Sequence, residues 1–82
     1  MSNKLLRLPT VKAESGLSRS TIYLRIAQCL WTRPVSLGAR AVAWPADEVQ
    51  ALNAARIAGK DDADIRKLVQ RLHEARTEGA AG

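Results

Sequence analysis

The sequence has few of the residues that catalytic and metal sites require. Its 82 residues include one histidine, one cysteine and no phenylalanine. A single cysteine forms no intramolecular disulfide, and one cysteine with one histidine is too few for a Cys/His zinc site. There is also no glycine-rich loop that would hold phosphates, and no acid–base pair at a catalytic spacing. We therefore expect a protein that is not an enzyme, has no catalytic residues and binds no metal or cofactor.

Long apolar runs are also absent. No stretch approaches the roughly 18 apolar residues that span a bilayer, and the chain has no charged-then-apolar signal peptide. These absences predict a cytoplasmic protein without a membrane partner. Aromatic residues make up only 4 % of the chain. We therefore expect an aliphatic core in which Trp31, Trp44 and Tyr23 are the few large side chains.

Positive charge is concentrated in the first half of the chain. The formal net charge is +5. Residues 1–40 carry seven basic residues against one acidic residue, whereas residues 41–82 carry six basic against seven acidic. A one-sided distribution is typical of a face that binds a polyanion, because each neutralised phosphate releases counterions. The imbalance therefore favours nucleic acid as a partner.

The segment from residue 10 to residue 28 has the layout of a helix-turn-helix. A short helix is expected after Pro9, and Gly16 supplies the left-handed residue that ends it. Ser18 is a good N-cap for a second helix, because its hydroxyl can accept from backbone donors two or three residues on. Ile22 and Ile26 then fall on one helical face. A helix, a glycine turn and a second helix are the parts of this DNA-binding motif.

The periodicity changes after this motif. Residues 34–37 and 41–44 are short β-prone runs separated by residues 38–40, which predicts a hairpin with a three-residue loop. A two-stranded hairpin is marginal alone, so it must pack on the helices. We expect Val35, Val42 and Trp44 to make that contact.

Two further helices are expected in the second half. One opens at Pro45, with acidic residues in its first turn, and ends near Ala58. Val49 and Leu52 are expected to face inward from it. The other is capped by Asp61 or Asp62 and runs to about Arg76. Its inward face carries apolar residues at helical spacing, namely Ile65, Leu68, Val69 and Leu72.

The sequence also leads to expectations about two polar side chains of the last helix and about where this helix packs. Asp62 is expected to pair with Arg66 one turn later. His73 is expected to be solvated. The helix itself either docks on the body of the domain or meets a neighbouring protomer or another protein, and for so short a chain we favour docking.

Several motifs together resemble one known family. They are RLP at Arg7–Pro9, SGLSRSTIY at Ser15–Tyr23, RPVSLG at Arg33–Gly38, the pair Arg40 and Trp44, and DEV at Asp47–Val49. In order and spacing, the stretch from Leu6 to Ala55 resembles the AlpA family of phage and mobile-element regulators. These are relatives of excisionases and of MerR-type winged-helix proteins. The resemblance covers about three fifths of the chain.

The resemblance implies a mostly α fold with a small β-hairpin, a winged helix-turn-helix with an extra C-terminal helix. Within a single domain, residues 1–58 would form the DNA-binding part and residues 59–78 a C-terminal helix packed on it. Residues 79–82 are expected to be a disordered tail. The protein would be bacterial, cytoplasmic and associated with the nucleoid.

The resemblance also implies a function in one of two forms. Some members activate or repress promoters, often that of an integrase, and others act as recombination directionality factors that steer the integrase towards excision. Double-stranded DNA is then the main partner, with an integrase and further copies of the chain side by side on DNA as additional candidates. The alternative is a protein-interaction module, antitoxin-like or an adaptor that docks on an integrase, without a DNA site of its own.

The candidate binding residues follow from the helix-turn-helix geometry. With Ile22 and Ile26 turned inward, the side chains expected to point away from the core are Ser20, Thr21, Leu24, Ala27 and Gln28. The first turn of this second helix is the part that would enter the major groove. The candidates on this helix are Ser18, Arg19, Ser20, Thr21, Tyr23 and Arg25, and those on the wing are Arg33, Ser36 and Arg40. Ser18 has the alternative role of an N-cap alone, Arg19 that of a solvated charge, and Arg25 that of a structural side chain. The alternative for Arg40 is a loop residue that only opposes aggregation.

Two positions depart from the family pattern. The family often has glycine where this chain has Cys29, just after the second helix. If that position needs a positive φ, cysteine carries a steric cost of roughly 1 kcal/mol. Cys29 is otherwise expected to be a small, buried or half-buried residue. Relatives also often place a basic residue where this chain has Leu24, so the base preference of this chain is open.

Overall fold

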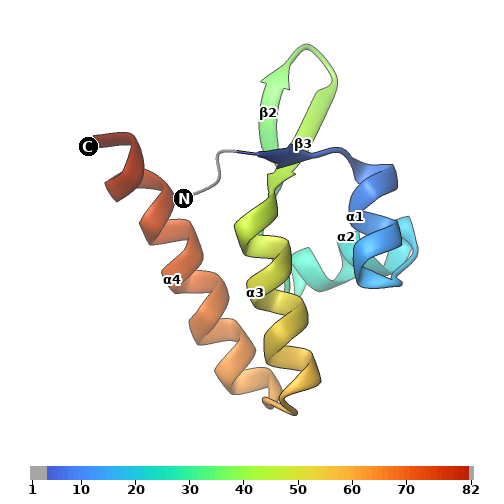
Figure 1. The fold of residues 1–82 in the computed structure, drawn as a ribbon, viewed down its shortest axis with the longest axis vertical. Coiled ribbons are helices and arrows are strands. Elements are labelled where there is room, and N and C mark those ends of the chain that lie inside the picture. The colour runs from blue at the N-terminus through green and yellow to red at the C-terminus, as the bar shows by residue number, and fades with distance from the viewer. Residues whose placement is uncertain (1–3, 82) are drawn as a thin grey trace.

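The computed structural model describes the backbone of residues 4–81 and the side chains of residues 4–77 (Figure 1). It is mostly helical with a small antiparallel sheet, as the sequence predicts, and its arrangement is that of a winged helix-turn-helix. The elements in chain order are β1 (Leu5–Leu6), α1 (Leu8–Ser15), α2 (Arg19–Ala27), β2 (Val35–Gly38), β3 (Ala41–Pro45), α3 (Ala46–Ile57) and α4 (Asp62–Ala81).

The sheet has the strand order β1-β3-β2. The short strand β1 pairs with β3 through Leu5 opposite Pro45 and Leu6 opposite Trp44. The β2–β3 hairpin projects away from the helices (Figure 1). Its register is irregular between Ser36 and Gly38, and β2 continues through Gly38. The expected three-residue loop is therefore a two-residue connection, with Ala39 at φ 41°.

One apolar core joins the helices to the sheet. Trp44 is fully buried and Trp31 is 2 % exposed, which confirms both tryptophans as packing residues. The expected inward positions of α3 are confirmed as well, since Val49 and Leu52 are buried. The other buried apolar residues of this cluster are Leu6, Val11, Ile22, Leu30, Ala46, Ile65 and Val69. Ile65 and Val69 come from α4, so this helix contributes to the same core.

The helix-turn-helix is held by local backbone features. Gly16 ends α1 at φ 72°, where its N–H donates to the Lys12 carbonyl at 2.8 Å. Ser18 then caps α2, because its Oγ accepts from the N–H of Thr21 at 3.2 Å. Helix α1 begins at Leu8, two residues before the expected start, with Pro9 in its first turn. A proline there is tolerated because the first helical N–H groups have no intrahelical partner.

Helix α4 differs from its sequence-based description in two ways. It continues to Ala81, beyond the expected end near Arg76, while residue 82 lies outside the described residues. The expected pair of Asp62 with Arg66 is wrong. Asp62 instead pairs with Arg56 at 3.2 Å, because the turn between α3 and α4 brings the two helix ends together.

Two other residues at the start of α4, Asp61 and Arg66, have contacts of their own. Asp61 is the capping residue, since its Oδ1 accepts from the N–H of Asp64 at 2.9 Å. Arg66 turns to the body of the domain and donates to the backbone carbonyl of Gln28 at 3.0 Å. Within the described part of the chain, no helix is both long enough and apolar enough to cross a membrane.

Candidate nucleic-acid interface

The first turn of α2 is exposed and polar. Ser18, Arg19 and Ser20 are exposed, and Thr21 is half-buried. The hydroxyls of Ser18 and Thr21 lie 2.9 Å apart and share a hydrogen bond. The capping role of Ser18 is therefore confirmed. The helix N-terminus presents backbone N–H groups and small hydroxyls together, a combination that suits an anionic oxygen.

Arg19 is held over an aromatic ring. Its guanidinium carbon lies 5.0 Å from the centroid of the Tyr23 ring. Tyr23 in turn meets the buried Trp44 edge-on, with centroids 6.3 Å apart and planes at 72°. A cation–π contact at an exposed site contributes about 0.5–1 kcal/mol. This stack therefore links the core to the first residue of α2 and restricts where its charge can lie.

The two faces of α2 are separated as the sequence predicts. Ile22 is buried and Ile26 is half-buried against the core. The side chains expected to point outward are Ser20, Thr21, Leu24, Ala27 and Gln28, and all except the half-buried Thr21 are exposed. Leu24 is 57 % exposed. Arg25 is half-buried at the border between the two faces.

Cys29 ends α2 in a way that the sequence only partly indicates. It is exposed, so the expectation of a buried or half-buried cysteine is wrong. Its φ is 61°, the left-handed conformation that glycine usually supplies. The Cys29 N–H donates to the Ile26 carbonyl at 3.1 Å and the Leu30 N–H to the Arg25 carbonyl at 2.8 Å. These two bonds form a Schellman motif, in which the residue at the position of Cys29 takes the left-handed conformation.

The wing carries its own cation. Arg40 lies in the hairpin turn and is exposed, as are Ser36 on β2 and Arg33 before it. The Ser36 Oγ accepts from the Gly38 N–H at 3.4 Å, so this serine supports the irregular end of the strand. Neither Arg19 nor Arg40 forms an ion pair with any of the described residues. Both charges are thus available to an external anion.

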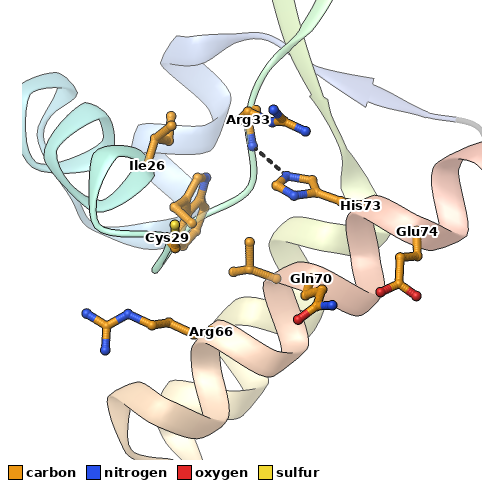
Figure 2. Close-up of a pocket in the computed structure, with 9 residues that line it drawn as sticks. Ile26, Cys29, Arg33, Arg66, Gln70, His73 and Glu74 are labelled. Carbon is orange, nitrogen blue, oxygen red and sulfur yellow. Dashed lines mark hydrogen bonds between the residues drawn. The ribbon is translucent and has the colours of Figure 1, made fainter.

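Helix α4 holds the base of the wing through both backbone groups of Arg33. The Arg33 N–H donates to His73 Nε2 at 3.0 Å, the bond drawn in Figure 2. The Arg33 carbonyl accepts from Arg76 Nη2 at 2.6 Å. The expectation that His73 is solvated is therefore wrong. Arg33 is consequently separated from Arg40: it lies against α4, whereas Arg40 lies at the far end of the hairpin.

The sequence does not reveal that Glu48 is buried and paired with an arginine of α4. It is 5 % exposed although it is charged. Arg76 donates from Nε to Oε2 at 2.7 Å and from Nη2 to Oε1 at 2.6 Å. The same guanidinium thus joins α3, α4 and the start of the wing. The carboxylate in the first turn of α3 is readable from the sequence, but its partner 28 residues later is not.

The surroundings of His73 favour its neutral form. Its pKa is lowered from 6.5, first by burial and then by the charges of Arg76 and Arg33, while Glu48 acts in the opposite direction. A neutral imidazole has one acceptor nitrogen, and Nε2 is the atom that accepts from Arg33. The lowered pKa and the hydrogen bond from Arg33 therefore both favour the neutral imidazole.

A hollow of about 580 Å³ lies between the end of α2 and α4. Figure 2 shows Cys29 and Ile26 on one side, with Arg66, Gln70, His73 and Glu74 of α4 on the other. Trp31 and Val69 add apolar surface to its lining. No group of three or more acidic, cysteine or histidine side chains among the described residues is placed to hold a metal ion.

A capped recognition-type helix, a preceding helix and a hairpin that carries arginine define a winged helix-turn-helix domain. The chain belongs to the family described as "Prophage CP4-57 regulatory protein (AlpA)", whose sequence model matches residues 4–57. It is also 49 % identical over 57 residues to the uncharacterized protein ORF88 of Enterobacteria phage P4. That match covers 70 % of this chain and 65 % of the phage protein, so this chain spans about two thirds of its relative's length. The protein is a member of a phage regulatory family.

Proposed function

We propose that this protein binds specific DNA sequences for a prophage or integrative element. In this role it acts as a recombination directionality factor (an excisionase), as a transcription regulator of the integrase, or as both. The observation that carries the proposal is the exposed first turn of α2, where Arg19 is oriented by Tyr23 and has no anionic partner among the described residues. Family membership supports a regulatory role for this surface.

Each candidate residue has a distinct role in the proposed complex. Arg19 is suited to a paired hydrogen bond with guanine, because the guanidinium fork matches the O6 and N7 acceptors in the major groove. Ser18, Ser20 and Thr21 are suited to phosphate oxygens together with the helix N-terminus. Tyr23 positions Arg19, and Arg25 reaches the backbone from the flank of the helix.

The wing would add contacts to the DNA beside those made by α2 in the major groove. Arg40 reaches phosphate or the minor groove, whose negative potential attracts arginine where it is narrow. Arg33 and Ser36 lie nearer the base of the hairpin and contribute at most to phosphate contacts. One recognition helix covers little DNA, so specific affinity is expected to require several copies side by side. An integrase is the further partner proposed for these assemblies.

A footprint tests the proposal directly. The DNA would carry the attachment site and the integrase promoter of the element that encodes the protein, with wild type compared with Arg19→Ala. Arg71→Ala is the matched control, because it removes an equal charge from an exposed position of α4. Protection of adjacent repeats near the crossover site, weakened by Arg19→Ala alone, supports a directionality factor. Protection confined to the promoter supports a transcription regulator.

Salt dependence separates DNA binding from the alternative, a protein-interaction module. Each neutralised phosphate changes the slope of log affinity against log salt by about 0.9. A DNA-binding protein therefore shows a steep slope. Arg40→Ala should reduce the magnitude of this slope by about 0.9, the value for one phosphate contact. No protection at low salt with micromolar protein would overturn the DNA-binding proposal. It would favour an antitoxin-like or integrase-docking protein instead.

A further inference from the structure

Leu24 is the large apolar side chain that α2 leaves exposed. It is 57 % exposed, whereas Ile22 on the same helix is fully buried. Its neighbours on the outward face are Ser20 one turn before and Ala27 about one turn after, both exposed. The middle of the outward face is thus apolar, with polar groups in the first turn of the helix and Gln28 just after its last residue.

An apolar centre restricts what this face can read. In the major groove guanine presents two acceptors, cytosine a donor, and adenine an acceptor with a donor. A leucine placed over any of these groups desolvates it without replacing its hydrogen bond, which is unfavourable. Thymine differs because it carries the C5-methyl group, the apolar group on a base edge of this groove. The residue opposite Leu24 should therefore be the base whose methyl group it can cover.

We propose that Leu24 is a specificity-determining residue that selects thymine by packing on its C5-methyl group, with Ala27 enlarging the apolar contact. This inference rests on the proposed function, since it requires α2 to lie in the major groove. It assigns base discrimination to a side chain that cannot hydrogen-bond, next to the hydrogen-bonding candidate Arg19. The recognition sequence is then expected to contain a fixed thymine beside the position that Arg19 reads.

The test removes one methyl group from the DNA and its partner from the protein. Binding sites are first selected from a random duplex library with the wild-type protein. Each thymine of the selected site is then replaced singly by deoxyuridine, which lacks only the C5-methyl group. We expect one position at which wild type loses about fourfold in affinity, the factor for one buried methyl group. In Leu24→Ala the penalty at that position should disappear.

Two further variants make the test specific. Ile57→Ala removes an even more exposed apolar side chain from the end of α3, and it should keep the full deoxyuridine penalty. Leu24→Gln places an amide at the same point, and repeated selection should then favour adenine, which glutamine pairs with through N6 and N7. Helix content measured by circular dichroism checks that each variant is folded.

The outcomes separate this inference from the proposed function. Selection of a defined site in which no thymine is sensitive to deoxyuridine would overturn the role of Leu24 and leave DNA binding intact. Equal penalties in wild type and Leu24→Ala would overturn it as well. Failure to enrich any sequence would instead overturn the proposed function on which the inference rests.

Discussion

The Nε2 atom of His73 accepts a 3.0 Å hydrogen bond from the backbone N–H of Arg33, 40 residues earlier in the chain. Arg76, on the next turn of α4, binds the carbonyl of the same residue at 2.6 Å. Helix α4 lies beyond residues 4–57, which the family model covers. A segment outside that region thus fixes the start of the wing.

The pH dependence of stability should report the state of His73. Its pKa is lowered in the folded protein, by burial first and then by Arg76 and Arg33, so below pH 6.5 the unfolded chain binds more protons than the folded one. The contribution of His73 is therefore complete above pH 6.5 and decreases as the pH falls towards the folded pKa. Urea unfolding at pH 7.5 and 5.5 measures this loss.

His73→Gln is the control for that measurement. Glutamine retains an acceptor for the Arg33 N–H but does not titrate, so the variant should lose less stability than wild type between the two pH values. Since His73 is the single histidine of the chain, the difference between the two proteins isolates its protonation. Identical pH profiles would contradict the assignment.

Removal of Arg76 should be costly. Arg76→Met leaves Glu48, whose side chain is 6 % exposed, without its cationic partner and also frees the Arg33 carbonyl. We expect a loss of about 2–4 kcal/mol in the free energy of unfolding, measured in urea. Arg71→Met on the exposed face of the same helix should change it by less than about 0.5 kcal/mol. The double variant Glu48→Gln with Arg76→Met should regain part of the lost stability, because it removes the unpaired charge of Glu48. A double variant less stable than Arg76→Met would show that this charge is not the cause of the loss.

The contrast between Ser18 and His73 shows how far the sequence reaches. The cap at Ser18, the inward face of Ile22 and the packing of Trp44 were predictable, because each depends on residues a few positions apart or on side-chain type alone. His73 and Glu48 depend on partners 40 and 28 residues distant. Such contacts exist only once α4 has docked on the body.

The error over Asp62 has a related cause. Spacing of four residues makes a pair with Arg66 possible, but it does not rank that pair against partners from another helix. In the structure Arg56 reaches Asp62 across the α3–α4 turn, and Arg66 binds the Gln28 carbonyl. Exposed charges of this kind differ little in energy between partners, so local spacing alone does not decide between them.

Cys29→Gly should stabilise the protein. Cys29 occupies a left-handed position at φ 61°, which costs a residue with a side chain about 1–2 kcal/mol relative to glycine. Glycine loses more backbone entropy on folding, so the net gain is expected to be about 0.5–1 kcal/mol. Thermal unfolding of Cys29→Gly, Cys29→Ala and Cys29→Val should give an order of stability with glycine highest and the β-branched valine lowest. A glycine variant no more stable than alanine would contradict the strain at this position.

Thr32→Val should also stabilise the protein, for a different reason. Thr32 is fully buried, and its hydroxyl has no hydrogen-bond partner among the described residues. Its backbone carbonyl has a separate role, since it accepts from Trp44 Nε1 at 2.9 Å. Valine has nearly the same shape, so it keeps the packing and the carbonyl but removes the unpaired hydroxyl. We expect a gain of about 1 kcal/mol in urea unfolding, because an unsatisfied buried polar group costs about 1–3 kcal/mol.

A matched variant distinguishes the hydroxyl from the side-chain volume at Thr32. Thr32→Ala removes both the hydroxyl and the methyl group, so the gain from the first should be offset by the cavity left by the second. The expected order of unfolding free energy is therefore valine above threonine, with alanine at or below threonine. If valine were less stable than threonine, the hydroxyl would have a favourable interaction in solution that outweighs its burial.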